Sequence, residues 1–337
     1  MRPVADPALV SGGDVYDARV IAGLRADGWT VHDAQVPGSW PRPDAAARRA
    51  LGDVLGAGDG PVLLDGLVAC GVPDVVVPHA RRRPVAVLVH LPLGQEQPDL
   101  EEAERAVLHA AGAVLATSPW AARRLRERHG LTGVTVAVPG VDPAPPAVGT
   151  DGAHRLLCLG AVSPTKGQDL LVAALAQLRG HPWTCDLVGP TGRAPAFVDD
   201  LRAAIAAHDL TDRIRIHGPR TGVDLEGIRR HADLLVVPSR VETYGMVVSE
   251  ALARGTPVLA SDVGGLPETV GTAGVLTPAE NVPALVAALH RWFAEPAHRA
   301  GLQHSAGSSR CRLASWTQTS RRVQQVLADL SATPTRS

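Results

Sequence analysis

Two glutamates and the segment between them are the strongest candidates for chemistry in this sequence. Glu242 and Glu250 are eight positions apart. An apolar strand, DLLVVPS, precedes Glu242, and a helix is expected to begin near Tyr244 and Gly245. If the segment were helical throughout, the carboxylates would lie roughly 12 Å apart, about the span of a sugar diphosphate with its ribose. The start of such a helix attracts phosphate groups, although two glutamates at this spacing are usually ordinary solvated side chains.

A second candidate is the loop LGAVSPTKGQDLLVAAL, in which Lys166 stands between a strand and a helix. Among the 33 basic residues, Lys166 is the only lysine, so its position indicates a need for that point charge. The loop is not a Walker A motif, because Lys166 precedes Gly167 and is not followed by Ser or Thr. Arg193, in the loop VGPTGR after another strand, is a second basic candidate, and a plain surface arginine is the competing interpretation.

Two features of the first half also merit attention. The buried strand PVAVLV ends at His90, whose side chain offers a hydrogen bond and, at an unperturbed pKa near 6.5, a change of charge. Gly12 and Gly13 precede a predicted helix, and glycines let a backbone approach a ligand closely. A core histidine and an ordinary glycine turn are the structural alternatives.

The glutamate segment in full, PSRVETYGMVVSEALARGTPVLASDVGG (238–265), closely resembles the E-x7-E signature of retaining glycosyltransferases of glycosyltransferase family 4. The match continues through E-A-L-A-x-G-x-P-V to the Gly264–Gly265 turn. The resemblance implies the GT-B architecture, an α/β fold of two Rossmann-like doubly wound domains facing a cleft. It covers the second half in register and most of the first half more thinly.

The resemblance also implies residue roles. Glu242 would contact the hydroxyls of the transferred sugar, Glu250 would bind the nucleotide ribose, and Lys166 would face the diphosphate. His90 would lie against the donor sugar as a third catalytic residue. The remaining implied donor-binding residues are Gly12, Gly13, Arg193, Tyr244, Gly245, Met246 and Val247.

The sequence departs from the family pattern at two places. The phosphate loop of the family usually reads G-R-x-x-x-x-K-G, but Ala161 stands where the arginine is expected, and Arg193 is our candidate substitute. The opening residues MRPVADPALV are too short and too rich in proline to supply the usual first strand. We therefore expect that the first strand is missing or that the true start lies upstream.

The spacing of apolar runs indicates the elements that position these residues. Strands and helix-length stretches alternate throughout, which is typical of parallel sheets. The proline-rich stretch 141–154 predicts a boundary between residues 1–148, the acceptor side, and residues 149–315, the donor side. An apolar stripe over 316–331 predicts a final helix that packs back on the first domain. The predicted strands lie near 29–36, 61–65, 84–90, 113–117, 134–138, 155–160, 184–189, 213–217, 233–238 and 257–260, and the predicted helices of the first half near 14–27, 44–57, 100–112 and 119–129.

Composition excludes several classes of protein. With 337 residues, 20% charged residues and a net charge of -1, the chain is neither disordered nor a general nucleic-acid binder. Cys70, Cys158, Cys185 and Cys311 are widely spaced and predict buried thiols of a reducing compartment. No apolar run is long enough to span a membrane, so we expect a cytoplasmic protein, with membrane docking through Arg123 and Arg124 left open.

The sequence therefore predicts a retaining hexosyltransferase that uses a nucleotide sugar, with a UDP- or GDP-hexose favoured as the donor. No D-x-D motif occurs, so no metal or other cofactor is expected. The expected acceptor is a small molecule, a glycan or a lipid-linked compound. Two alternatives stay open: a binding protein that has lost catalysis, motivated by Ala161, and a phosphorylase or epimerase of the same architecture.

Overall fold

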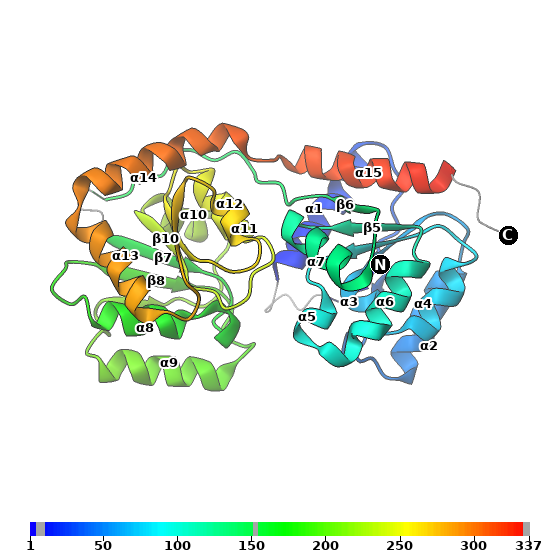
Figure 1. Ribbon diagram of the computed structural model, residues 1–337, viewed down its shortest axis with the longest axis horizontal. Coiled ribbons are helices and arrows are strands. Elements are labelled where there is room, and N and C mark those ends of the chain that lie inside the picture. The colour runs from blue at the N-terminus through cyan, green and yellow to red at the C-terminus, as the bar shows by residue number, and fades with distance from the viewer. Residues whose placement is uncertain (5–10, 151–153, 333–337) are drawn as a thin grey trace. The chain divides into compact units, whose positions relative to one another are not determined.

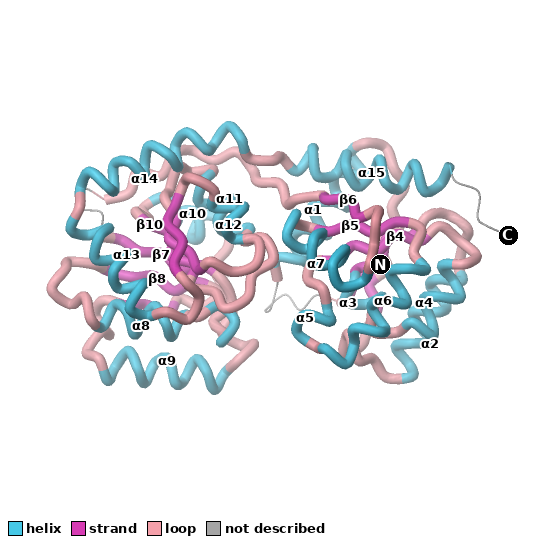
Figure 2. Tube along the Cα trace, viewed as in Figure 1, coloured by secondary structure: helices cyan, strands magenta, loops and turns pink. Residues whose placement is uncertain are grey.

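The computed structural model describes residues 1–4, 11–150 and 154–332. The chain forms two compact α/β units, which are coloured by residue number in Figure 1 and by secondary structure in Figure 2. The first unit contains residues 1–4, 12–140 and 314–332, and the second contains residues 11, 141–150 and 154–313. Parallel strands form the sheets of both units, which confirms the predicted fold class.

The second unit is built on a parallel sheet that has six strands in the described part of the chain. Strands β7 and β10 are neighbours at the centre of the sheet. The strands that follow β7 in sequence lie on one side of this pair, and those that follow β10 lie on the other side. Loops that follow such a pair lie together at the carboxyl edge of the sheet, where open α/β sheets bind ligands. In sheet order the strands are β12 (Gly274–Thr277), β11 (Val258–Ser261), β10 (Leu234–Val237), β7 (Arg155–Leu159), β8 (Thr184–Val188) and β9 (Ile214–Ile216).

Helices cover both faces of this sheet, and each face has its own apolar core. Leu156, Leu187 and Val236 pack with α8 (Gln168–Ala176), α9 (Pro195–Ala207) and α13 (Val282–Ala294). Leu157 and Leu235 point to the other core, because successive side chains of a strand alternate between faces. That core includes α10 (Gly222–Arg230), α11 (Met246–Leu252), α12 (Leu266–Val270) and α14 (Pro296–Ser309).

The first unit has a smaller parallel sheet in the order β3 (Val62–Asp65), β4 (Val85–Val89), β5 (Ala113–Ala116) and β6 (Val134–Val136). One face packs on a core shared with α2 (Ala45–Gly56), α3 (Gly66–Ala69), α4 (Pro73–Ala80), α6 (Glu101–Ala110) and α7 (Pro119–His129). The other face is covered by α1 (Gly12–Ala26) and by α15 (Trp316–Ala332). In Figure 1, α15 runs beside α1, and it packs on β4 and β5. A short helix, α5 (Leu93–Glu96), follows β4.

The first strand is present, so the expectation that it is missing is wrong. Strand β1 (Arg2–Pro3) pairs in parallel with β2 (Gln35–Val36). On its other side the Met1 amino group donates to the Leu63 carbonyl at 2.6 Å, and the Asp65 N–H donates to the Met1 carbonyl at 3.0 Å. The strand is reduced to two residues, and the predicted strand 29–36 is likewise reduced to its last two. The same region holds a cavity of about 630 Å³, whose lining includes Trp29 and Val31.

Other sequence predictions also differ in detail from the structure. The remaining strands and helices predicted with bounds are confirmed to within a few residues. The short helices α3 and α5, helix α4 and strand β12 were not predicted. Cys70, Cys158 and Cys185 are buried free thiols, but Cys311 is exposed, which corrects the prediction for that residue. Residues 141–150 have no regular structure, and residues 151–153 of the predicted linker lie outside the described residues. None of the described helices combines the length and the apolar stretch needed to cross a membrane.

Candidate active site

Lys166 and Glu242 meet at the carboxyl edge of the second sheet. The loop after β7 carries Lys166 at the end of a short 3-10 turn, Pro164–Lys166, and the loop after β10 carries Glu242. The Lys166 ammonium donates to Glu242 Oε2 at 2.5 Å, and the side chains are 31% and 15% exposed. The structure thus brings together two of the three predicted catalytic residues, and each leaves part of its surface open to a ligand.

Glycines allow these two loops to approach each other. Gly167 has a φ of 67°, and a Cβ at this position would lie 2.0 Å from the Pro238 carbonyl oxygen. Gly264 has a φ of 57°, and its Cβ would lie 1.7 Å from the Glu242 carbonyl oxygen. A side chain at either position would push apart backbone segments that hold the ion pair. The Gly264–Gly265 turn therefore packs directly against the backbone of the Glu242 loop.

The Glu242 loop continues into α11 without forming helix at its start. Gly245 has a φ of 85°, and regular helix begins only at Met246. The estimate of roughly 12 Å between the glutamates assumed helix throughout, so it does not apply. The Tyr244 phenol accepts a hydrogen bond from Ser249 at 3.1 Å, while Met246 and Val247 are the first residues of α11.

Glu250 lies on α11 and is paired with an arginine that sequence reasoning did not select. Arg229, on α10, donates to Glu250 Oε2, and the side chains are 18% and 27% exposed. Burial raises the pKa of the Glu250 carboxyl, while the charges of Arg229 and Arg254 act in the opposite direction. Glu226 accepts hydrogen bonds from Arg254, which also donates to the Glu250 carbonyl at 2.7 Å, so the four residues form a network at the carboxyl-terminal end of α11.

Ala161, the residue that departs from the family pattern of the phosphate loop, lies just after the end of β7. Gly160 has a φ of 153° at the end of β7, and the carbonyl of Ala161 accepts a hydrogen bond from Gln168 at 3.0 Å. Arg193 is exposed in the loop between β8 and α9. Its predicted role as a substitute for the arginine expected at position 161 stays a prediction.

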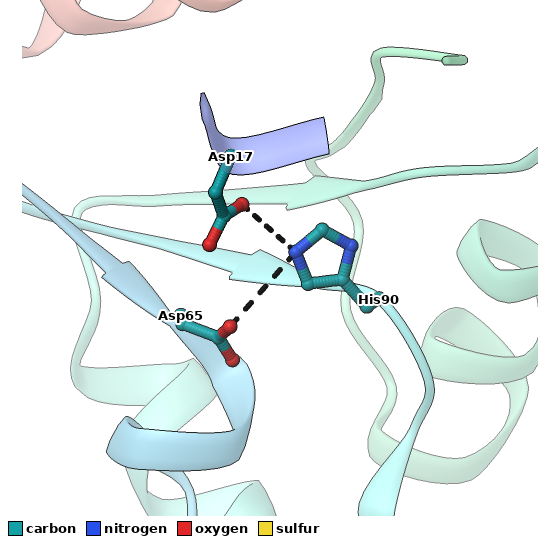
Figure 3. A group of neighbouring side chains, drawn as sticks. All are labelled: Asp17, Asp65 and His90. Carbon is teal, nitrogen blue, oxygen red and sulfur yellow. Dashed lines mark hydrogen bonds and ion pairs between the residues drawn. The ribbon is translucent and has the colours of Figure 1, made fainter. Parts of the chain in front are cut away.

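His90 follows β4 in the first unit and meets two carboxylates there. Its Nε2 lies 3.0 Å from Oδ1 of Asp17, on α1, and 3.9 Å from Oδ2 of Asp65, at the end of β3 (Figure 3). Burial alone would lower the pKa of His90, but the hydrogen bond and charge of Asp17, with the charge of Asp65, raise it to about 9. The three side chains offer ligand-type atoms within 4.8 Å of one another, the one such group in the part of the chain that the structure describes. We assign no ion to it, because Nε2, the nitrogen directed toward both carboxylates, is engaged by Asp17.

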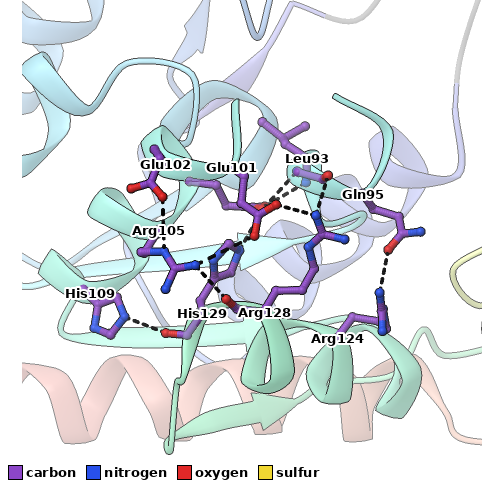
Figure 4. A network of polar contacts seen from close by, with 11 residues as sticks. Leu93, Gln95, Glu101, Glu102, Arg105, His109, Arg124, Arg128 and His129 are labelled. Carbon is purple, nitrogen blue, oxygen red and sulfur yellow. Dashed lines mark hydrogen bonds and ion pairs between the residues drawn. The ribbon is translucent and has the colours of Figure 1, made fainter. Parts of the chain in front are cut away.

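A polar network holds the segment that follows His90. Glu104, fully buried on α6, accepts hydrogen bonds from the N–H groups of Leu93 and Gly94 at 2.7 and 3.1 Å. His129, also fully buried, lies 2.9 Å from the same carboxylate. Around them Arg128 donates to the Gly94 carbonyl, as part of the network in Figure 4. The start of α5 is therefore fixed by buried side chains.

Gly12 and Gly13 are the first residues of α1, so they belong to a helix where a glycine-rich loop was expected. The residues missed by sequence reasoning are Asp17, Asp65 and Arg229. For Asp65 a signal existed, because it ends the strand adjacent to β4, and strand ends of a parallel sheet share one edge. Asp17 and Arg229 lie within helices, where nothing in the sequence separates them from solvated residues.

Two Rossmann-like units with these loops define the GT-B class of glycosyltransferase folds. Residues 153–295 match the family described as Glycosyl transferases group 1. The matched residues all belong to the second unit of the chain.

Curated relatives carry a common name. The chain is 34% identical over 230 residues to D-inositol 3-phosphate glycosyltransferase of Kineococcus radiotolerans, covering 59% of this chain and 53% of the relative. It is 35% identical over 241 residues to the protein of the same name from Nocardiopsis dassonvillei, covering 64% and 55%. The match therefore spans little more than half the length of these relatives.

Solved structures of low sequence identity share the fold over nearly the whole chain. Sucrose-phosphate synthase from Thermosynechococcus elongatus has a TM-score of 0.79 at 22% identity, covering 98% of this chain and 94% of that one. The Anabaena protein HepE, solved in complex with UDP-glucose, has a TM-score of 0.78 at 19% identity, covering 97% and 99%.

Proposed function

We propose that this chain is a retaining glycosyltransferase that moves a hexose from a nucleotide sugar to a hydroxyl of a small acceptor. The observation that carries the proposal is the contact between Lys166 and Glu242 at the carboxyl edge of β7 and β10. A cation and a carboxylate at this edge suit the two parts of the donor that change during the reaction. The lysine would neutralise the departing diphosphate, and the glutamate would accept hydrogen bonds from the hydroxyls of the sugar.

A UDP-hexose is the donor that we favour. A structural neighbour, HepE, was solved with UDP-glucose, and relatives are named for an inositol phosphate acceptor. The proposed acceptor is therefore a phosphorylated polyol such as D-inositol 3-phosphate. In the proposed reaction the bond between the anomeric carbon and the diphosphate breaks while the acceptor oxygen bonds to that carbon on the same face. The departing phosphate takes the acceptor proton, and we place this reaction in the cytoplasm.

The proposal is tested with the purified full chain and UDP-, GDP- and dTDP-hexoses, each with and without D-inositol 3-phosphate. We expect release of UDP that depends on the acceptor, and a product whose anomeric configuration, read by NMR coupling constants, matches the donor. An inverted product would contradict retention. Donor binding without turnover would favour the non-catalytic alternative, and conversion of donor alone would favour an epimerase.

Two substitutions separate the proposed ends of the donor. Glu242→Gln keeps the size of the side chain and removes its charge beside the sugar, so kcat should fall by at least about tenfold while UDP affinity changes little. Glu250→Ala should instead weaken UDP binding by about tenfold, since a ribose contact acts alike in ground and transition states. Glu102→Gln, on an exposed side chain of α6, is the matched control and should change neither quantity. Equal UDP affinity of the parent and Glu250→Ala would refute the ribose role.

A further inference from the structure

Asp17 holds the His90 ring by one particular nitrogen. Its Oδ1 lies 3.0 Å from Nε2, and the Asp65 carboxylate approaches the same nitrogen at 3.9 Å. Both aspartate side chains are only 10% exposed, whereas the histidine side chain is 22% exposed. The ring is therefore anchored on its inner side and open on the other.

Neighbouring groups fix the orientation of the ring. Tyr16 packs edge-on against it, with ring centroids 5.2 Å apart and an interplanar angle of 83°, and the Tyr16 hydroxyl donates to the Ala137 carbonyl at 2.8 Å. The Asp65 carboxylate is fixed in turn, because Oδ1 accepts the Leu67 N–H at 2.6 Å. A ring flip would break the bond to Asp17 without forming another to the same carboxylate.

The second ring nitrogen, Nδ1, lies on the side away from both carboxylates (Figure 3). Within residues 1–4, 11–150 and 154–332, no hydrogen-bond partner is found for it. We propose that Asp17 is a positioning residue for His90, which fixes Nε2 so that Nδ1 is the atom presented, as a hydrogen-bond donor, to an oxygen of the sugar substrate. This inference rests on the proposed function, because it assigns His90 to the sugar.

The charges around the ring keep both nitrogens protonated at neutral pH. Burial lowers the pKa of His90, but Asp17, Asp65 and Asp14 together raise it to about 9. The other titratable groups that face the cluster are Tyr16 and the amino terminus, whose charge opposes the rise that burial causes in the pKa of Asp65. At neutral pH His90 is therefore an imidazolium that donates from Nδ1 and has no lone pair with which to act as a base. As pH rises through 9, Nδ1 loses its proton, because Nε2–H stays bonded to Asp17.

The test is a titration of the histidine ring followed by nitrogen NMR on the full chain, with the His90 signals assigned from His90→Gln. We expect a parent pKa near 9 and, in Asp17→Asn, a pKa lowered toward the ordinary value of 6.5. Asparagine keeps the shape and an acceptor oxygen, so the variant removes charge with little change in packing. Asp53→Asn, at an exposed position of α2, is the matched control and should leave the His90 titration unchanged. Added UDP-glucose should shift the Nδ1 signal more than that of Nε2.

The activity profile supplies a second measurement. The alkaline limb of kcat/KM should lie near pH 9 in the parent and move by about two pH units toward neutral in Asp17→Asn, as a lowered histidine pKa requires. A parent pKa near 6.5, an unchanged pKa in Asp17→Asn, or a donor-induced shift confined to Nε2 would each overturn the positioning role. Displacement of the Nε2 proton by one equivalent of Zn²⁺ would also overturn it.

If Asp17→Asn fails to fold, the parent titration and the donor-induced shift still decide the matter. The titration needs no turnover, so failure of the transferase assay is distinguishable from failure of this inference.

Discussion

Lys166 occupies a position where its charge serves both the resting loop and the proposed reaction. Its partner Glu242 is 76 positions away in sequence, and the pair is partly buried. Partly buried charges interact more strongly than exposed ones because less water screens them. The pair therefore links the loops after β7 and β10, while part of each side chain remains exposed.

At this scale we predict that Lys166→Ala lowers kcat/KM by about 100-fold or more, because a charge facing the leaving group matters most as negative charge develops there. Lys166→Arg should lower kcat/KM less, because arginine keeps the positive charge, although a planar guanidinium replaces the compact ammonium group. Steady-state kinetics with UDP-hexose check this, with thermal melting of each variant as the control for folding. A parent-like kcat/KM, within about threefold, would remove Lys166 from the site.

At the scale of elements, the turn between β11 and α12 packs against the Glu242 loop. Gly264 and Gly265 lie very close to the backbone of the Glu242 loop. A Cβ on Gly264 would lie 1.7 Å from the Glu242 carbonyl oxygen, and a Cβ on Gly265 would lie 2.0 Å from the Thr243 carbonyl oxygen. The turn thus acts as a fixed support for a loop that has no regular structure of its own.

We predict that Gly264→Ala displaces the Glu242 loop and lowers both stability and activity. Its positive φ of 57° alone costs roughly 1–2 kcal/mol for an alanine. Gly130→Ala is the matched control, because its φ is 67° but nothing lies within 4 Å of the new Cβ. Chemical denaturation should show a larger loss of unfolding free energy for Gly264→Ala, and only that variant should lose donor binding. Equal effects of the two substitutions would mean that the contact with the Glu242 loop is unimportant.

On the scale of the whole molecule, the chain ends in the unit where it begins. Helix α15 packs on α1, where Gly23 leaves room for Ser320, and the Thr319 hydroxyl donates to the Val138 carbonyl at 2.8 Å. Val323 and Leu327 are buried in the same core as Leu88 and Leu115. The face of the first sheet that is shared by α1 and α15 is therefore completed only when the last helix has been added.

We predict that Val323→Asp destabilises the first unit by more than about 3 kcal/mol, because it places an unpaired carboxylate in this core. Ala328→Asp, on the exposed face of the same helix, should change stability by no more than about 0.5 kcal/mol. Denaturation followed by tryptophan fluorescence and circular dichroism would measure both. A similar loss in the two variants would show that α15 contributes charge effects and not packing.

The sequence by itself determined the alternation of strands and helices and the fold class, because apolar spacing and turn residues act over short distances. It also singled out Lys166, Glu242 and His90, through residue type, position at strand ends and a family motif. Only the tertiary structure decided which side chains meet. Asp17 and Asp65 at His90, and Arg229 at Glu250, come from separate elements whose approach depends on sheet order and helix packing. The two-residue first strand was likewise undecided, because a strand so short carries no pattern and is held by its neighbours on both sides.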